Sequence, residues 1–248
     1  MIDILRSEWT KIRSVRSTVW TLVVTAFLMV GLAVAFGFAA KGSAGGEPVP
    51  GDAATMMSMA GVMVASLSMA ALGVLVISSE YRTGGIRTSL MAVPKRMSLL
   101  TGKIAVFTAT ALVTSLLAAS AAMLAGLLIT QPPSLDMGDV LRSVLGASLY
   151  LTACGLFGLG LGTLIRHTPG AMVSVIALIT VLPPITVQLP GQWGRTVSEF
   201  FTTNAGMLIV IPPRGDSTLG PWSGFGVYLV WIAVPLIVGA VAMRRRDA

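Results

Sequence analysis

Charged residues are scarce in this sequence of 248 residues, making up only 11% of it. A soluble domain carries about 25% charged residues, which it needs to give its surface enough polarity. Hydrophobic residues reach 54%, and the mean hydropathy is +0.85. The shortage of charge therefore excludes an ordinary water-soluble domain and favours lipid as the surroundings. No polar stretch is long enough to hold a separate core, so we expect one transmembrane domain over residues 1–248.

Cysteine and histidine occur once each, as Cys154 and His167. A lone cysteine cannot form an internal disulfide. One histidine and one cysteine far from any cluster of carboxylates do not suggest a metal site. We expect neither a metal nor a cofactor bound to this chain.

Catalytic motifs are missing as well. The sequence holds neither the His-Glu-x-x-His motif of zinc proteases nor the Gly-x-Ser-x-Gly turn of serine hydrolases. Gly102-Lys103 does not complete a Walker A loop, because Met97 stands where that loop needs glycine and Ile104 follows the lysine. We therefore expect a chain that is not an enzyme and does not hydrolyse ATP itself.

Long hydrophobic runs are what the sequence does contain. A helix needs about 20 apolar residues to cross the hydrocarbon core of a bilayer. Six stretches qualify or nearly qualify, and none has Asp, Glu, Lys or Arg in its interior: 19–40, 56–78, 104–130, 144–165, 171–189 and 222–243. The runs are long and do not alternate with polar residues, which indicates helices and not strands. The sequence predicts an all-α integral membrane protein, a bundle of six transmembrane helices.

Small residues recur at four-residue spacing in two of these runs. One row is Ala118, Ala122 and Gly126, and another is Gly158 and Gly162. Small side chains let helix backbones approach closely in lipid, so these rows predict tight helix contacts.

The distribution of basic residues predicts the orientation. Of the 17 Lys and Arg residues, 13 fall in the N-terminal segment, the C-terminal segment and the connections on their side. Positive charge in short connections collects on the cytoplasmic side, so we expect both termini in the cytoplasm. The same bias accounts for the net charge of +7 without a nucleic-acid partner.

Residues 1–18 precede the first run and combine apolar and basic positions. Ile2, Leu5, Trp9 and Ile12 recur at helical spacing, with the basic residues mostly elsewhere around the helix. This pattern predicts an amphipathic helix in the inner interface, with Trp9 as an anchor at headgroup depth. The alternative is a simple basic flank of the first span.

Residues 79–102 connect the second and third runs on the cytoplasmic side. Gly84-Gly85 should break the helix that leaves the membrane, and a short apolar repeat then ends at Pro94. Two interpretations stay open on these grounds: a short amphipathic helix that projects into the cytoplasm, or a solvated basic loop that only fixes topology.

Residues 190–221 lie outside by the same topology, yet they are too apolar for an ordinary loop. Val197–Ile211 is also too short to cross. We expect half-helices that dip into the outer leaflet and break near Asn204-Ala205-Gly206, or else a surface helix. Pro183-Pro184 should end or kink the fifth span.

The six apolar runs contain few side chains that could bind or transfer ions. A proton-driven carrier needs ionisable groups within the membrane, and the six runs have none in their cores. Methionines cluster along the second run, at Met56, Met59, Met63 and Met69. They suit either a permissive path for apolar compounds or ordinary packing, because methionine fills irregular gaps.

Three local patterns resemble those of type-2 ABC transporter permeases, particularly compact bacterial ones from actinobacteria. Residues 5–14, Leu-Arg-Ser-Glu-Trp-Thr-Lys-Ile-Arg-Ser, resemble the start of such permeases. Residues 79–88, Ser-Glu-Tyr-Arg-Thr-Gly-Gly-Ile-Arg-Thr, followed by Val-Pro-Lys-Arg at 93–96, resemble their first cytoplasmic loop. Thr-Asn-Ala-Gly at 203–206 is similar to a segment that they place outside.

The resemblance implies a partnership. Such permeases pair as homodimers or heterodimers, and two copies of a separate ATP-binding subunit hold the ATP. Their amphipathic N-terminal helix and first cytoplasmic loop meet that subunit. By this likeness, the coupling contact would hold six residues of the loop, with Glu8 and Lys11 nearby: Glu80, Tyr81, Arg82, Thr83, Gly84 and Arg87.

The sequence thus predicts the permease subunit of an ATP-driven exporter in the bacterial cell membrane. Because the chain lacks the added soluble domain of polysaccharide and lipid exporters, a small hydrophobic or peptide-like compound is the favoured cargo. The alternative is a six-span membrane protein that transports nothing, such as an immunity protein, a sensor or an assembly factor.

Overall fold

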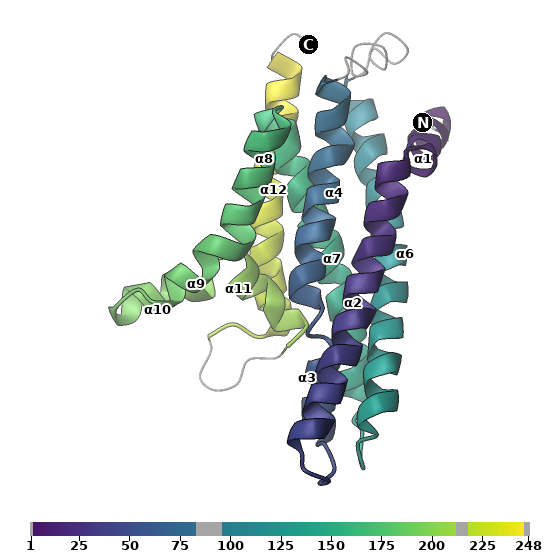
Figure 1. Cartoon of the computed structure of the whole chain (residues 1–248). Helices are drawn as coiled ribbons and strands as arrows, with labels where there is room; N and C mark the ends of the chain where they lie inside the picture. The colour runs from purple at the N-terminus through teal and green to yellow at the C-terminus, as the bar shows by residue number, and fades with distance from the viewer. Residues whose placement is uncertain (1, 83–95, 212–217, 246–248) are drawn as a thin grey trace.

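The computed structural model describes residues 2–82, 96–211 and 218–245, and these residues form helices and turns without a β-strand. The longer helices lie side by side along the long axis of the molecule (Figure 1). Their bounds in chain order are α1 Ile2–Ser14, α2 Arg16–Ser43, α3 Gly51–Ser58, α4 Val62–Arg82, α6 Arg96–Thr130, α7 Met137–Ile165, α8 Thr168–Ile176, the π-helix η1 Ala177–Val181, α9 Leu182–Val187, α10 Gly191–Glu199, α11 Thr202–Gly206, the 3-10 helix η2 Met207–Ile209 and α12 Pro221–Arg245.

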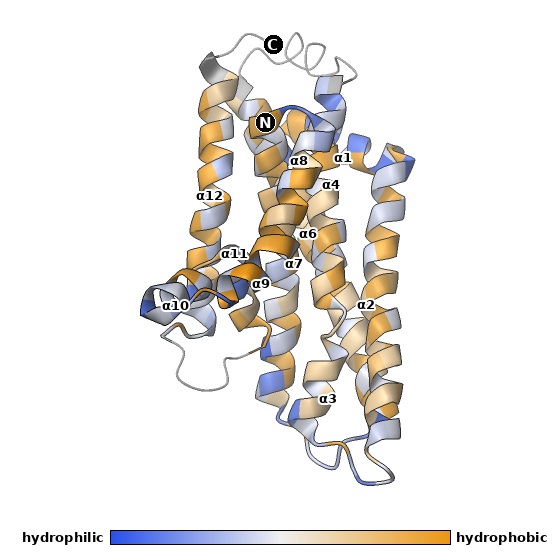
Figure 2. Cartoon of the chain, turned by 60° about the vertical axis from the view of Figure 1, so that its left-hand side comes forward, coloured by the Kyte–Doolittle hydropathy of each residue, from blue (hydrophilic) through white to orange (hydrophobic). Residues whose placement is uncertain are grey.

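Six helical segments among the described residues are long and apolar enough to cross a membrane, which confirms the predicted fold class. They are Arg16–Ser43, Gly51–Tyr81, Met97–Thr130, Met137–Ile165, Thr168–Val187 and Pro221–Met243. Hydrophobic residues cover most of their length, and hydrophilic residues gather toward the ends (Figure 2).

The start of α1 and the last turns of α12 lie at the same end of the bundle (Figure 1). We call it the inner end, after the orientation that the basic residues predict, and the opposite end the outer end.

Helix α7 is the centre of the bundle. In its apolar window 78% of the residues are buried, the highest share among the six spans, and α4, α6 and α12 pack around it. The contact with α4 is the closest. A Cβ atom on Gly73 would lie 1.9 Å from the carbonyl oxygen of Gly155, and one on Gly158 would lie 2.0 Å from that of Ala70. Only glycine fits at these two positions.

The two predicted rows of small residues both face neighbouring helices. A Cβ atom on Gly162 would lie 2.6 Å from Ile77 of α4, and one on Gly126 would lie 2.1 Å from the hydroxyl of Ser58 in α3. Ala118 and Ala122 are buried on the same face of α6. Close helix contact in lipid therefore follows the spacing of these residues.

The second span is not the single helix that the hydrophobic run at 56–78 suggests. It begins earlier, as α3, turns at residues 59–61 and continues as α4. At the turn, a Cβ atom on Gly61 would lie 2.8 Å from the Cα atom of Met29. The turn thus brings the chain against the backbone of α2, and a hydrogen bond of 2.8 Å joins Thr25 and Ser68 further along the two helices.

The connection that we predict to be cytoplasmic is shorter than the expected range 79–102, because α4 continues to Arg82 and α6 begins at Arg96. The short helix considered for this connection falls in residues 83–95, outside the described residues.

The fifth span bends where the proline pair predicts. Pro183 and Pro184 lie in the first turn of α9, which begins at Leu182 directly after the π-helix η1. From there α9 and α10 lean away from the bundle (Figures 1 and 2).

The external segment consists of short helical pieces, but its break differs from the expectation. α11 runs through Asn204-Ala205-Gly206, and the break lies at Phe200-Phe201. Trp231 of α12 holds this break, because its indole donates to the carbonyl of Phe200 at 2.9 Å and its ring meets that of Phe201 at 5.3 Å.

The α4–α7 contact yields a first prediction. Gly158→Ala should destabilise the protein by at least the ~1–3 kcal/mol typical of overpacking, because the new methyl group meets backbone and not a movable side chain. Gly31→Ala in α2, with nothing within 4 Å of its Cβ position, is the matched control and should be neutral or slightly stabilising. Thermal unfolding in detergent measures both. Equal melting temperatures for the two variants would contradict the close contact.

Candidate functional site

Helix α1 lies against the inner ends of α4 and α6. Its buried residues are Ile4, Glu8 and Ile12, spaced four apart on one face. Gly102 makes room for this face, since a Cβ atom there would lie 2.6 Å from the Ile4 side chain. Trp9, the predicted anchor, points away with 52% of its surface exposed. Its place at headgroup depth stays a prediction.

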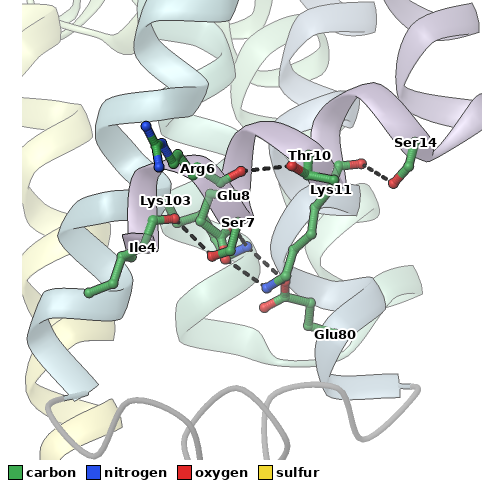
Figure 3. Close-up of polar contacts among 9 residues, drawn as sticks. All are labelled: Ile4, Arg6, Ser7, Glu8, Thr10, Lys11, Ser14, Glu80 and Lys103. Atoms are coloured by element: carbon green, nitrogen blue, oxygen red, sulfur yellow. Dashed lines mark hydrogen bonds and ion pairs between the residues drawn. The ribbon is translucent and has the colours of Figure 1, made fainter. Parts of the chain in front are cut away.

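Four charged side chains form a closed ring between α1, α4 and α6 (Figure 3). Lys103 lies 2.5 Å from one oxygen of Glu8 and 2.8 Å from Glu80. Lys11 lies 2.6 Å from the other oxygen of Glu8 and 2.9 Å from the same oxygen of Glu80. Acid and base alternate around this ion ring, so every neighbour around it carries the opposite charge.

Most of the ring is buried, and burial raises the free-energy cost of its charges. The side chains of Glu8 and Lys103 are only 2% and 3% exposed, and that of Glu80 is 13% exposed. A buried charge is costly unless an opposite charge and hydrogen bonds compensate it. The two carboxylates and two ammonium groups sum to zero, and each cation donates to both acids. The charges of the ring are therefore balanced only when all four side chains are present.

Lys11 lies at the exposed edge of the ring, with 39% of its side chain accessible. Burial lowers the pKa of Lys11, but the carboxylates of Glu8 and Glu80 outweigh that effect and hold the pKa above its ordinary value of 10.5. Lys11 is therefore charged at neutral pH. Its contribution to folding is complete below pH ~10 and is lost only when the pH rises through the raised pKa.

Tyr81 turns to the other side of α4. The guanidinium of Arg166, between α7 and α8, lies 5.1 Å from the centre of the Tyr81 ring. Arg166 also donates to the carbonyl of Ala242 in α12 at 3.3 Å, and Thr168 donates to Ser78 at 3.0 Å. The inner end of α4 is thus tied to α1 and α6 by Glu80, and to the α7–α8 turn and α12 by its neighbours.

The structure brings together three of the residues that the resemblance singles out, namely Glu8, Lys11 and Glu80. Tyr81 lies on the other side of α4, against Arg166. Arg82 is the last residue of α4. Thr83, Gly84 and Arg87 lie outside the described residues.

Sequence reasoning missed Lys103, which joins both acids. A signal was present, because acids are rare near the inner end and a lysine stands at the very start of a hydrophobic run. The third span was expected to start at residue 104, whereas α6 begins at Arg96, so Lys103 lies inside the helix and not in a loop.

Comparison with protein families matches residues 4–187 to the family described as ABC-2 family transporter protein. This chain belongs to the ABC-2 transporter family. The match confirms the resemblance to type-2 ABC permeases, and it runs from α1 to α9, including the whole ion ring. A comparison with curated proteins gives no match.

Membership, with the six spans, makes the chain a multi-pass membrane protein, in bacteria a protein of the cell membrane. Permeases of this family are membrane subunits that generally work as dimers with an ABC ATP-binding subunit, and they are generally not catalytic themselves.

The ring gives a second prediction. Lys103→Met leaves two buried carboxylates facing one cation, so it should cost about 3–5 kcal/mol of stability. The double variant Glu8→Met with Lys103→Met keeps the Glu80–Lys11 pair and should recover most of that loss, since paired apolar replacements of a buried ion pair are often neutral. Thermal unfolding of these two variants and of the single variant Glu8→Met tests this. If the double variant is as unstable as the sum of its single substitutions, the two charges are not coupled.

Proposed function

We propose that this permease is a dimeric exporter of a small hydrophobic or peptide-like compound. Two copies of a separate ATP-binding subunit would hold the ATP, on the cytoplasmic side of the inner end. The contact with that subunit would lie at the α4–α6 connection, at Glu80, Tyr81, Arg82, Thr83, Gly84 and Arg87, with Glu8 and Lys11 nearby.

The observation that carries the coupling proposal is the ion ring. The connection at residues 83–95 leaves from α4 and returns to α6, and the ring ties Glu80 of α4 to Lys103 of α6 and to α1. A force on the connection would therefore act on α1, α4 and α6 together, which suits transmission of a rigid-body movement.

Their positions in the ring suggest different roles for Glu8 and Lys11 in the proposed coupling. Glu8 is almost completely buried and faces the bundle, so its role would be to fix α1 and not to touch the ATPase. Lys11, at the exposed edge, remains accessible to a partner.

The cargo proposal rests on an apolar cavity of ≈650 Å³ toward the outer end of the bundle. Residues of α4, α7, the fifth span and the external segment line it, among them Met63, Leu67, Pro184 and Met207. Several polar residues also reach the lining, among them Ser66, Asn204 and Glu199, but most of the lining surface is apolar. Predominantly apolar walls with a few polar groups suit a small hydrophobic or peptide-like ligand.

Three of the four methionines that cluster along the second span divide between the two interpretations of the sequence. Met59 and Met69 are fully buried members of the core and serve packing, whereas Met63 lines the apolar cavity. Met63 is therefore the methionine of this cluster that would meet cargo there.

The third prediction tests the partnership. We expect a gene for a separate ABC ATPase beside that of the permease, and the two proteins should co-purify. In proteoliposomes Arg82→Ala should reduce association or ATP hydrolysis by about tenfold, the value of one charge-assisted contact. Lys41→Ala, an exposed basic residue at the outer end of α2, is the matched control and should change neither. Absence of any association would favour a six-span protein that does not transport.

The fourth prediction tests the cavity. Met63→Trp should fill part of it and reduce ATP-driven uptake of a lipophilic dye, such as Nile red, into inverted vesicles, while ATPase binding stays normal. Leu117→Trp, an exposed apolar position on α6, controls for the added aromatic group. Equal uptake by both variants would place the cargo path elsewhere.

A further inference from the structure

The bend in the fifth span leaves two backbone carbonyls without their usual partners. Residues 183 and 184 are prolines and have no N–H, so the carbonyl of Ile179 finds neither an α-helical nor a π-helical amide donor. For the carbonyl of Leu178, the π-helical position is again occupied by Pro183, which has no N–H. The amide at its α-helical position, that of Leu182, donates to the carbonyl of Ala177 instead. In lipid such groups need another donor.

Two threonines of α11 supply these donors. The hydroxyl of Thr202 donates to the carbonyl of Leu178 at 2.7 Å, and that of Thr203 donates to the carbonyl of Ile179 at 3.1 Å. Both threonines are buried. Two adjacent hydroxyls therefore match two adjacent orphaned carbonyls, 24 positions earlier in the chain.

Asn204, the next residue, connects α11 to α9 and α10 as well. Its side-chain amide lies 3.4 Å from the carbonyl of Pro183 in α9 and 3.0 Å from that of Ser198 in α10. The hydroxyls of Thr186 and Ser198 lie within 3.2 and 3.3 Å of the same nitrogen. We call Thr202, Thr203 and Asn204 the latch, and η1, α9 and α10 together the arm.

The two sides of the latch differ in how firmly they are held. α11 is packed on α12, where a Cβ atom on Gly224 would lie 2.6 Å from the carbonyl oxygen of Ala205, and Trp231 fixes the residues just before it. The arm packs mainly against itself, α8 and α11, with a hydrogen bond from Thr218 to Glu199 at the end of α10. Val187 and Trp193 on the arm are 65% and 61% exposed. The latch thus joins a fixed element to a lightly held one.

The arm and the latch are also walls of the apolar cavity. Pro183, Pro184 and Val187 line it from the arm, and Thr203 and Asn204 line it from the latch. Movement of the arm about its junction with α8 would change the access to this cavity from the outer end. π-helical turns are frequent where a helix serves a function.

We propose that Thr202, Thr203 and Asn204 are positioning residues that hold the arm closed over the cavity and release it when cargo leaves. Side-chain hydroxyls replace backbone amides at the bend, so the arm can part from α11 without unfolding either helix. When the arm is released, water at the outer end can take over the carbonyls. The role in cargo release rests on the proposed function, whereas the closing contact does not.

Spin labels on Trp193→Cys in α10 and Leu128→Cys at the outer end of α6 measure the arm directly. Both positions are exposed, whereas the native Cys154 is buried. In nanodiscs without ATPase or cargo, the wild-type latch should give one narrow distance distribution. Thr202→Val with Thr203→Val keeps the shape but removes both hydroxyls, and it should raise a second distance population about tenfold, the ratio expected for the loss of one to two net hydrogen bonds.

Three further variants make the test decisive. Thr202→Ser with Thr203→Ser keeps the hydroxyls and should restore the narrow distribution. Asn204→Asp removes the amide donor and should broaden it. Thr196→Val, whose hydroxyl bonds only within α10, should leave it unchanged.

An unchanged distribution in the valine variant, or equal broadening in the serine variant, would overturn the proposal. So would loss of folded protein in both the valine and the aspartate variants, because the contacts would then be needed for the fold and could not be released. Because no ATPase is present, failure of the proposed function leaves this result intact. A latch that opens normally in a permease that binds no ATPase would refute only the role in transport.

Discussion

The constraint on which this structure depends is that lipid offers no hydrogen bonds to the backbone. A span must satisfy its own amides and carbonyls, so the sequence contains long apolar runs that form helices. Where a run is interrupted, another part of the chain must compensate. At residues 59–61 the second span turns against the backbone of α2. At Pro183-Pro184, where two amides are lost, the hydroxyls of Thr202 and Thr203 replace them.

The same constraint acts on charge at the inner end. Glu8 and Lys103 are almost fully withdrawn from solvent, and each would be unstable there without the other. A hydrophobic contact between α1 and α6 could slide, but the ring fixes one register, because each cation must reach two acids on different helices. Buried ion pairs contribute little net stability, and here the gain is a defined position of α1 relative to the root of the α4–α6 connection.

The sequence was informative where one residue type has one physical consequence. Hydrophobic length predicted the six spans, the proline pair predicted the bend, and Gly158 and Gly162 predicted a close helix contact. It failed where the meaning depends on a distant partner. Lys103 reads as one more basic residue near the membrane until Glu8, 95 positions earlier, lies against it. Likewise, Thr202 and Thr203 read as ordinary polar residues, because the carbonyls that need them belong to another helix.

Helix α4 connects the inner and the outer features. Glu80 of the ring and Met63 of the cavity lie at opposite ends of this unbroken helix of 21 residues, about 25 Å apart at the helical rise of 1.5 Å per residue. Between them, the close contacts of Gly73 with α7 and of Gly158 with α4 leave no space for α4 to bend or slide independently. Packed interiors transmit displacement and do not absorb it. A force on the inner end of α4 must therefore move α4 and α7 together, and with them the cavity wall that faces the arm.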